Sequence, residues 1–191
     1  SYFQDPRKKE VKNLRNFILF NPSRVTRWKG HLNLLKQFLQ FEKNLKNQIT
    51  LKFISNHSSK YEIELDKFIK QNSLSSKVIF EQPTNEIKKL YLNSDIVINS
   101  SINPEGFGRT ISESLALNIP AIGPNLGGVR EQLEKFDKNL MYQVYSSESL
   151  QKALRYIINN YFEISSKSRD FVIKNFSLEK MISKTLEVYE L

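Results

Sequence analysis

Two glutamates that flank a glycine loop are the residues of this 191-residue chain best suited to chemistry. Glu105 and Glu113 enclose the run Gly106-Phe107-Gly108-Arg109-Thr110, which follows an apolar segment and opens a helical pattern. The first amides of a helix have no intrahelical partner and lie at its positive dipole end, and glycines let an anion approach them. We therefore predict an anion site in this loop. Neither carboxylate lies on the apolar face of the helix, so we expect both to be free to accept hydroxyl hydrogen bonds.

Cationic side chains occur in a second loop, nearer the start of the chain. The segment from Ser23 to His31 contains Arg24 and Lys29. An arginine clamps phosphate oxygens in a planar fork, and a lysine supplies a compact charge that can follow a leaving group. The two residues together suit a diphosphate. The plainer alternative is a solvated basic loop formed by Arg24, Arg27 and Lys29.

Short apolar strands alternate with helical patterns, which predicts a parallel sheet with helices on both faces. We predict strands at residues 17–20, 50–55, 77–80, 95–99, 119–123 and 140–144. The first strand should end at Asn21-Pro22, because proline cannot donate to the ladder. Loops at the carboxyl ends of parallel strands share one edge of the sheet, where ligands bind. That edge would collect Arg24, Lys29, the glycine loop and the bare amides of Gly127-Gly128.

Length and composition predict a single Rossmann-like α/β domain at residues 16–191, preceded by a charged, aperiodic linker or entry arm at residues 1–15. With 39% hydrophobic residues the chain can form one core, but it is too short for two such domains. It starts at Ser1 and has no apolar run long enough for a signal peptide or a membrane span, so we interpret it as part of a longer protein. Without cysteine and with two histidines it offers little for a metal site, and we expect none.

The formal net charge of +9 is compatible with nucleic acid, with an anionic membrane surface or with a lysine-rich soluble protein. The lysines are spread through the helical patterns rather than clustered with aromatic residues, so we expect no nucleic-acid partner. A nucleic-acid-binding domain stays an alternative, and a steep salt dependence of affinity would support it.

The two loops resemble the motifs of the family 4 retaining glycosyltransferases, also described as glycosyl transferases group 1, which have two Rossmann-like domains in the GT-B fold. Glu105 and Glu113, with seven residues between them, resemble the acidic signature of that family, and Arg24 with Lys29-Gly30 resembles its diphosphate-binding pair. The segment from Ser23 to His31 is similar to a form found in enzymes of surface polysaccharide assembly. Further likenesses at residues 91–95, 120–122 and 127–131 extend the resemblance from about Phe17 to the C-terminus.

This resemblance implies the C-terminal, donor-binding half of an enzyme that moves a hexose from a nucleoside diphosphate sugar to a glycan or lipid-linked acceptor. Arg24, Lys29 and Glu105 would be the catalytic residues. The donor would contact these residues and the others of the acidic motif: Gly106, Phe107, Gly108, Arg109, Thr110 and Glu113. Within that set Glu105 would hold the sugar, the helix amides the phosphates, and Glu113 the ribose.

The same resemblance implies retention of configuration without a metal or other cofactor, in polysaccharide or lipopolysaccharide assembly. The acceptor would bind an N-terminal domain that this chain lacks, so we expect the chain alone to be inactive. We expect a cytoplasmic protein, with peripheral contact to an anionic membrane as an option. Besides the nucleic-acid alternative, a nucleotide-binding module without catalysis and an epimerase or phosphorylase of similar architecture stay open.

Overall fold

A six-stranded parallel sheet forms the centre of the molecule. The computed structural model describes residues 16–45 and 48–189, so the predicted linker at residues 1–15 lies outside the described residues. The strand order is β3-β2-β1-β4-β5-β6, as in Rossmann-like domains, and every neighbouring pair is parallel. The strands are β1 (Asn16–Arg24), β2 (Gln48–Ile54), β3 (Val78–Glu81), β4 (Ile96–Ile98), β5 (Ala121–Pro124) and β6 (Met141–Tyr142). The predicted fold class is confirmed.

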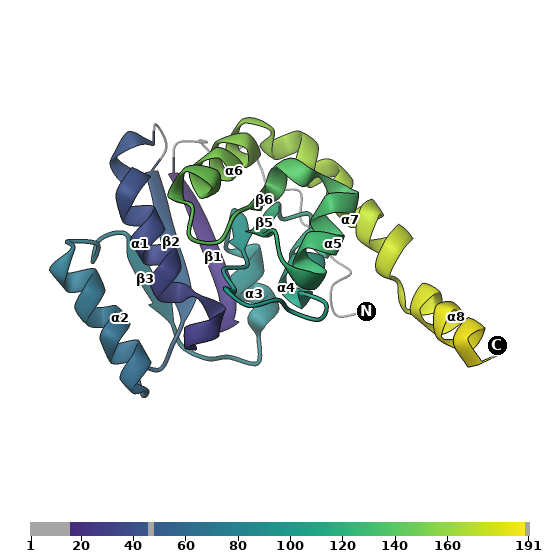
Figure 1. The fold of residues 1–191 in the computed structure, drawn as a ribbon, viewed down its shortest axis with the longest axis horizontal. Helices are drawn as coiled ribbons and strands as arrows, with labels where there is room; N and C mark the ends of the chain where they lie inside the picture. Colours follow the sequence, from purple (N-terminus) through teal and green to yellow (C-terminus); the bar gives the residue numbers. More distant parts are fainter. Residues whose placement is uncertain (1–15, 46–47, 190–191) are drawn as a thin grey trace.

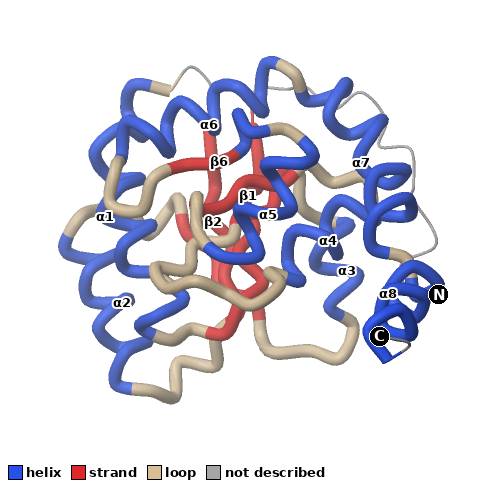
Figure 2. The backbone as a smooth tube through the Cα atoms, turned by 45° about the vertical axis from the view of Figure 1, so that its right-hand side comes forward, coloured by secondary structure: helices blue, strands red, loops and turns tan. Residues whose placement is uncertain are grey.

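Helices cover both faces of this sheet (Figures 1 and 2). They are α1 (His31–Phe41), α2 (Lys60–Gln71), α3 (Ile87–Leu92), α4 (Arg109–Ala116), α5 (Gly127–Phe136), α6 (Ser147–Asn159), α7 (Tyr161–Phe176) and α8 (Leu178–Tyr189). The strand order reverses after β3, so right-handed connections place α1 and α2 on one face and α3 to α5 on the other. Accordingly α1 contacts α2 and α6, whereas α4 contacts α5 and α7. None of the helices in the described ranges is both long and apolar enough to cross a membrane.

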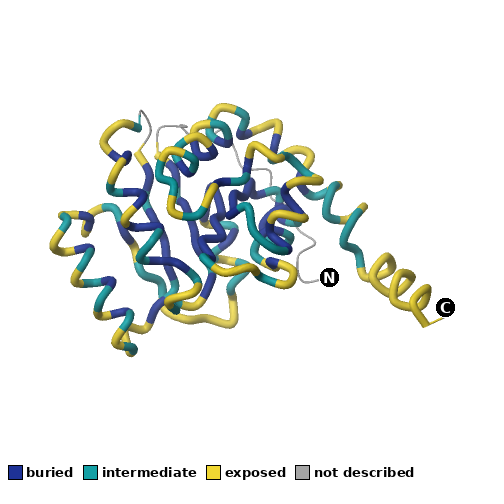
Figure 3. The backbone as a smooth tube through the Cα atoms, in the orientation of Figure 1, coloured by how far each residue is buried: buried dark blue, intermediate teal, exposed yellow. Residues whose placement is uncertain are grey.

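The core lies between the sheet and its two helical layers (Figure 3). All three residues of β4, Ile96, Val97 and Ile98, are fully buried, as expected for a β-branched strand covered on both sides. Helix α8 differs from the rest, because it extends away from the domain and none of its described residues is buried (Figure 1). The sheet edge that concerns function is therefore built on a strand that is buried along its whole length.

Strand β1 continues beyond Pro22, so the predicted end of the first strand is wrong. The pairing with β2 shifts between Asn21, opposite Phe53, and Arg24, opposite Ile54. This bulge takes the proline out of the ladder, so no amide hydrogen is required from it. The Ser23 amide donates to Asn21 Oδ1 over 3.1 Å, which closes the turn locally.

His31, the first residue of α1, is fully buried. Its ring lies edge-on against Phe53 of β2, with 5.1 Å between the ring centroids. Within the described part of the chain neither ring nitrogen makes a hydrogen bond. Burial lowers the pKa of this imidazole from 6.5 to about 4.

Replacing His31 should therefore weaken the acid sensitivity of the fold. Between pH 6.5 and about 4 the unfolded chain binds a proton at this residue and the folded chain does not, so acid favours unfolding. In denaturant titrations at a series of pH values, we expect the free energy of unfolding of the wild type to fall as the pH is lowered from 6.5 to about 4. The free energy of unfolding of His31→Gln should fall less over the same interval. His57→Gln retains the buried imidazole and is the control. Equal slopes for His31→Gln and the wild type would contradict the prediction.

Candidate functional site

Three loops meet at the carboxyl ends of β1, β4 and β5, which are neighbours in the sheet. The first loop contains Lys29, the second contains Glu105, and the third leads into Gly127-Gly128, the first residues of α5. The strand order reverses between β1 and β4, and open α/β sheets bind their ligands at such a switch point. The predicted residues Lys29, Glu105 and Gly128 are thus brought to the predicted edge.

An ion pair joins the first two loops. Lys29 Nζ lies 2.8 Å from Glu105 Oε1, and the two side chains are only 16% and 13% exposed. The ammonium group also lies 4.2 Å from the centroid of the Trp28 ring, a cation–π contact. Two backbone ties hold the loops together: Ser100 Oγ donates to the Lys29 carbonyl over 2.7 Å, and the Ile102 amide donates to the Trp28 carbonyl over 2.9 Å. Lys29 is therefore partly buried and paired, so the alternative of a solvated basic loop does not describe this residue.

Glu105 is held through one of its two carboxylate oxygens. Asn99 Nδ2 donates to Oε1 over 2.9 Å, and Ser101 Oγ donates to the same atom. Partial burial acts to raise the pKa of Glu105, but hydrogen bonds from Lys29, Ser101 and Asn99 outweigh it and lower the pKa. Oε2 accepts no hydrogen bond from the described residues. The expectation of a free carboxylate is wrong for Oε1, because Asn99 and Ser101 of its own loop and Lys29 of the neighbouring loop supply donors to it.

The carboxylate of Glu113 is held on both sides, so the expectation that it is free is also wrong. The hydroxyl of Tyr91, a fully buried residue of α3, donates to Oε2 over 2.9 Å. Arg109, one turn earlier on α4, lies 2.7 Å from Oε1 with an exposed guanidinium. Burial and the charge of Glu113 raise the pKa of Tyr91 well above its ordinary value. Helix packing thus brings a core hydroxyl to a carboxylate that lies outside the apolar stripe.

The glycine loop has the backbone arrangement that the predicted anion site needs. Gly108 precedes α4 with φ +80°, a conformation that favours glycine. Arg109 and Thr110 begin the helix, so their amides precede any intrahelical acceptor. Thr110 Oγ1 accepts from Asn99 Nδ2 over 2.9 Å. At Gly106 an added Cβ would meet nothing within 4 Å, so the loop is open at this residue.

The start of α5 packs against this loop instead of presenting a bare amide at Gly128. The Gly128 amide donates to the Glu105 carbonyl over 2.8 Å, which corrects the expectation for this residue. A Cβ on Gly128 would lie 2.6 Å from the Cα of Phe107, so a residue with a side chain does not fit. Gln132, buried on α5, donates through Nε2 to the carbonyls of Phe107 and Gly108. The Gly127-Gly128 segment and α5 therefore hold the glycine loop in its conformation.

Phe107 packs beside the C-terminal end of α7. Its ring meets that of Phe176 edge-on, with 5.4 Å between centroids, although 45% of the residue stays exposed. This contact favours a wedge that fixes the loop, and it leaves a face of the ring in solvent.

The two arginines of the first loop differ from Lys29. Arg24, the last residue of β1, is exposed, and its side chain makes no ion pair or hydrogen bond with the residues described. Arg27 forms an exposed 2.8 Å ion pair with Glu64 of α2 and so fits the solvated-loop alternative. The role predicted for Arg24 stays a prediction.

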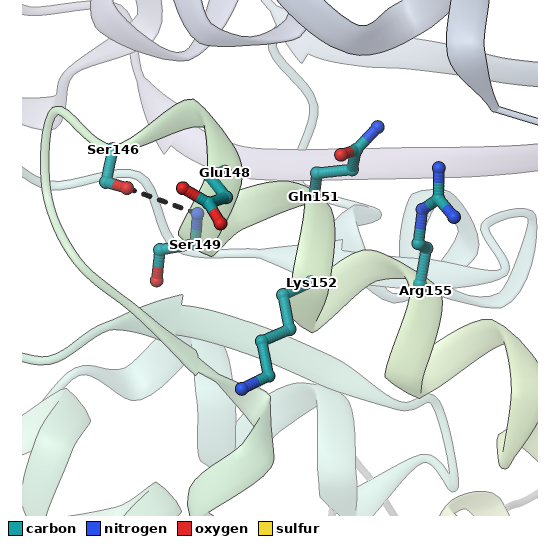
Figure 4. Close-up of a pocket in the computed structure, with 6 residues that line it drawn as sticks. All are labelled: Ser146, Glu148, Ser149, Gln151, Lys152 and Arg155. Carbon is teal, nitrogen blue, oxygen red and sulfur yellow. Dashed lines mark hydrogen bonds between the residues drawn. The ribbon is translucent and has the colours of Figure 1, made fainter.

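A separate pocket of about 590 Å³ lies on α6 (Figure 4). Its lining residues are Ser146, Glu148, Ser149, Gln151, Lys152 and Arg155. Ser146 Oγ accepts from the Ser149 amide over 3.2 Å and so caps the helix. Arg155 donates to the Asn44 carbonyl over 3.3 Å, which ties α6 to the short 3-10 helix that follows α1 (Glu42–Asn44). These contacts serve the fold, and no residue predicted for the site lines this pocket.

Comparison with known proteins agrees with the strand order and the position of the loops. Residues 3–176 match the family described as "Glycosyl transferases group 1". The chain belongs to this family. Membership establishes a glycosyltransferase fold and confirms the resemblance seen in the acidic and basic motifs, while the residue roles stay predictions.

Two solved structures and one curated protein illustrate the likeness to this family. A glycosyltransferase from Rickettsia africae is 28% identical, with a TM-score of 0.82 over 99% of this chain and 54% of its own. Anabaena Alr3699/HepE, solved with UDP and glucose, is 24% identical, with a TM-score of 0.76 over 92% of this chain and 49% of its own. The N-acetyl-alpha-D-glucosaminyl L-malate synthase of Bacillus anthracis is 21% identical over 64% of this chain and 33% of its own. The chain thus spans about half of the solved relatives and a third of the curated one.

Sequence reasoning missed three residues that organise the site: Asn99, Tyr91 and Gln132. Asn99 had a detectable signal, because a polar run, Asn99-Ser100-Ser101, directly follows a buried strand at the edge where ligands bind. Tyr91 is fully buried, and nothing in the local pattern shows which carboxylate its hydroxyl reaches. Gln132 lies among the buried residues of α5, and its partners belong to a distant loop.

The close packing of α5 on the loop predicts different effects for two alanine substitutions. Gly128→Ala forces a Cβ against Phe107, and overpacking of this kind typically costs about 1–3 kcal/mol. Gly106→Ala places its Cβ in open space and is the matched control. Denaturant unfolding should show a lower free energy of unfolding for Gly128→Ala and a nearly unchanged one for Gly106→Ala. Similar values for the two variants would show that this contact does not constrain the loop.

Proposed function

We propose that this chain is the donor-binding half of a retaining hexosyltransferase that uses a nucleoside diphosphate sugar. The observation that carries the proposal is the contact of Lys29 with Glu105 at the switch point, beside the first turn of α4. A cation, a carboxylate with an uncommitted oxygen, and the start of a helix lie together there. These groups suit a diphosphate joined to a polyhydroxylated sugar.

Each group would take one part of the donor. Lys29 would exchange its contact with Glu105 for a phosphate oxygen, and Arg24 would supply a second cation from the end of β1. The amides at Arg109 and Thr110 would bind the phosphates. As the diphosphate leaves it gains negative charge, which fixed cations stabilise without a metal ion. Glu105 Oε2 would accept hydrogen bonds from the sugar, and Glu113 would hold the ribose.

The comparisons support the nature of the donor. Alr3699/HepE was solved with UDP, with UDP and glucose, and with UDP-glucose, and a TarM variant with UDP. Since the chain spans about half of its solved relatives, we propose that residues 16–191 form the donor domain and that a second domain binds a glycan or lipid-linked acceptor. Transfer would then require both domains, because positioning the acceptor supplies much of the rate. We place the complete enzyme in polysaccharide or lipopolysaccharide assembly, in the cytoplasm or on the inner face of the membrane.

Loss of either cation should weaken the binding of a nucleoside diphosphate more than the binding of a nucleoside. A charge-assisted contact is typically worth about 1.5–3 kcal/mol. Arg24→Ala and Lys29→Ala should therefore each weaken the binding of UDP roughly tenfold or more and hardly affect the binding of uridine. Isothermal calorimetry with both ligands measures this difference. Arg27→Ala removes the same charge from the same loop, where Glu64 already pairs it, and should leave both affinities nearly unchanged. Equal losses for UDP and uridine would contradict the assignment.

The two glutamates should differ in which part of the donor they bind. Glu113→Gln should weaken both UDP and UDP-glucose, because both contain the ribose, whereas Glu105→Gln should weaken only UDP-glucose. Calorimetric isotherms with both ligands for each variant test this division. If Glu105→Gln weakens the binding of both ligands equally, or Glu113→Gln weakens the binding of neither, the two roles are wrongly assigned. In the complete enzyme Glu105→Gln should also lower turnover, since hydrogen bonds to the sugar strengthen as charge develops on its ring.

A further inference from the structure

Asn99 lies where the buried strand β4 ends and the site begins, and it is only 2% exposed. Its side-chain Nδ2 donates to Glu105 Oε1 and to Thr110 Oγ1, each over 2.9 Å. Its Oδ1 accepts from the Ser101 amide over 3.0 Å. A primary amide has two hydrogens to donate, and both are used here. One buried side chain thus connects the carboxylate, the first turn of α4 and the loop between them.

We propose that Asn99 is a positioning residue that fixes the orientation and ionisation of Glu105 and ties it to Thr110. The inference rests on the proposed function for what Glu105 binds, while the geometry of Asn99 stands independently. With its amide donor committed to Oε1, Asn99 holds that oxygen beside Lys29, the charged group that contacts Glu105 among the described residues. Oε2 is then the oxygen that stays available to a ligand.

The chemistry of an amide suits this position better than that of other side chains. An aspartate of nearly the same shape would place a second carboxylate against Glu105, and like charges at this distance disfavour ionisation of both. An alanine would remove one of the donors to Oε1, which would keep Ser101 and Lys29, and would also remove the donor to the Thr110 hydroxyl. Only a neutral donor of this length serves the carboxylate and the hydroxyl together while accepting from Ser101.

The backbone of Asn99 has a separate, structural task. Its amide donates to the Ile122 carbonyl of β5 over 3.0 Å, and its carbonyl accepts from the buried hydroxyl of Tyr142 over 2.9 Å. Any residue except proline at this position supplies these two backbone groups. Substitution of the side chain therefore tests positioning while it retains the ties between β4, β5 and β6.

A titration of Glu105 in the ligand-free 191-residue chain tests the inference. Carbon-detected NMR follows the side-chain carboxyl resonances with pH, and the Glu105 signal is the one that Glu105→Gln loses. In Asn99→Asp the titration midpoint of Glu105 should rise by about one pH unit or more, because a like charge replaces a donor. In Asn99→Ala it should rise by less, since a donor is lost and no charge is added.

The matched control is Asn72→Asp. Asn72 follows α2 at the opposite edge of the sheet, where its Nδ2 donates to the Phe68 carbonyl over 2.8 Å, so the variant adds the same charge away from the site. Its Glu105 midpoint should equal that of the wild type. An unchanged midpoint in folded Asn99 variants overturns the inference, and so does failure of Asn99→Ala to fold, because Asn99 would then act through stability alone. The measurement needs no donor, so its result is independent of the calorimetric tests of function.

Discussion

The contact between Lys29 and Glu105 is the interaction on which the organisation of the site depends. Two charges that are mostly removed from water must each find a partner, because burying an unpaired charge costs far more than burying a pair. In the ligand-free protein each group satisfies the other. A phosphate and a sugar offer replacements for both partners, so the pair keeps the two loops in register while both groups stay exchangeable. The two charged groups are thus already largely desolvated before a donor binds.

Supports from three directions keep this pair in place. The backbones of Trp28 and Lys29 are tied to the loop after β4, and Asn99 holds Glu105 from the end of that strand. Helix α5 closes the loop from the far side, through the Gly128 amide and the side chain of Gln132. A binding residue is placed precisely only when the groups that hold it are fixed, and here those groups begin at the end of β4, a fully buried strand.

Local sequence patterns predicted most of the fold. All six strands occur close to the predicted residues, and helices connect them as predicted, because the spacing of apolar residues reflects which positions the folded chain buries. Asn118 takes φ +56° just after α4, a conformation that this short polar side chain allows. The error at Pro22 has a clear cause: a rule about the donor that proline lacks does not foresee a bulge that removes the need for one.

The sequence by itself determined the positions of the strands, the family and the loops that carry charged residues, since residue type and spacing are local properties. Only the tertiary structure decided which side chains are committed to one another. Glu105 and Glu113 look equally free along the chain, yet one is held through a single oxygen and the other through both. Tyr91 and Gln132 reach partners on other elements more than 20 residues away, whereas Asn99 reaches Glu105 within its own loop, six residues along the chain. Such pairings follow from the packing of helices and loops on the sheet, which no local spacing encodes.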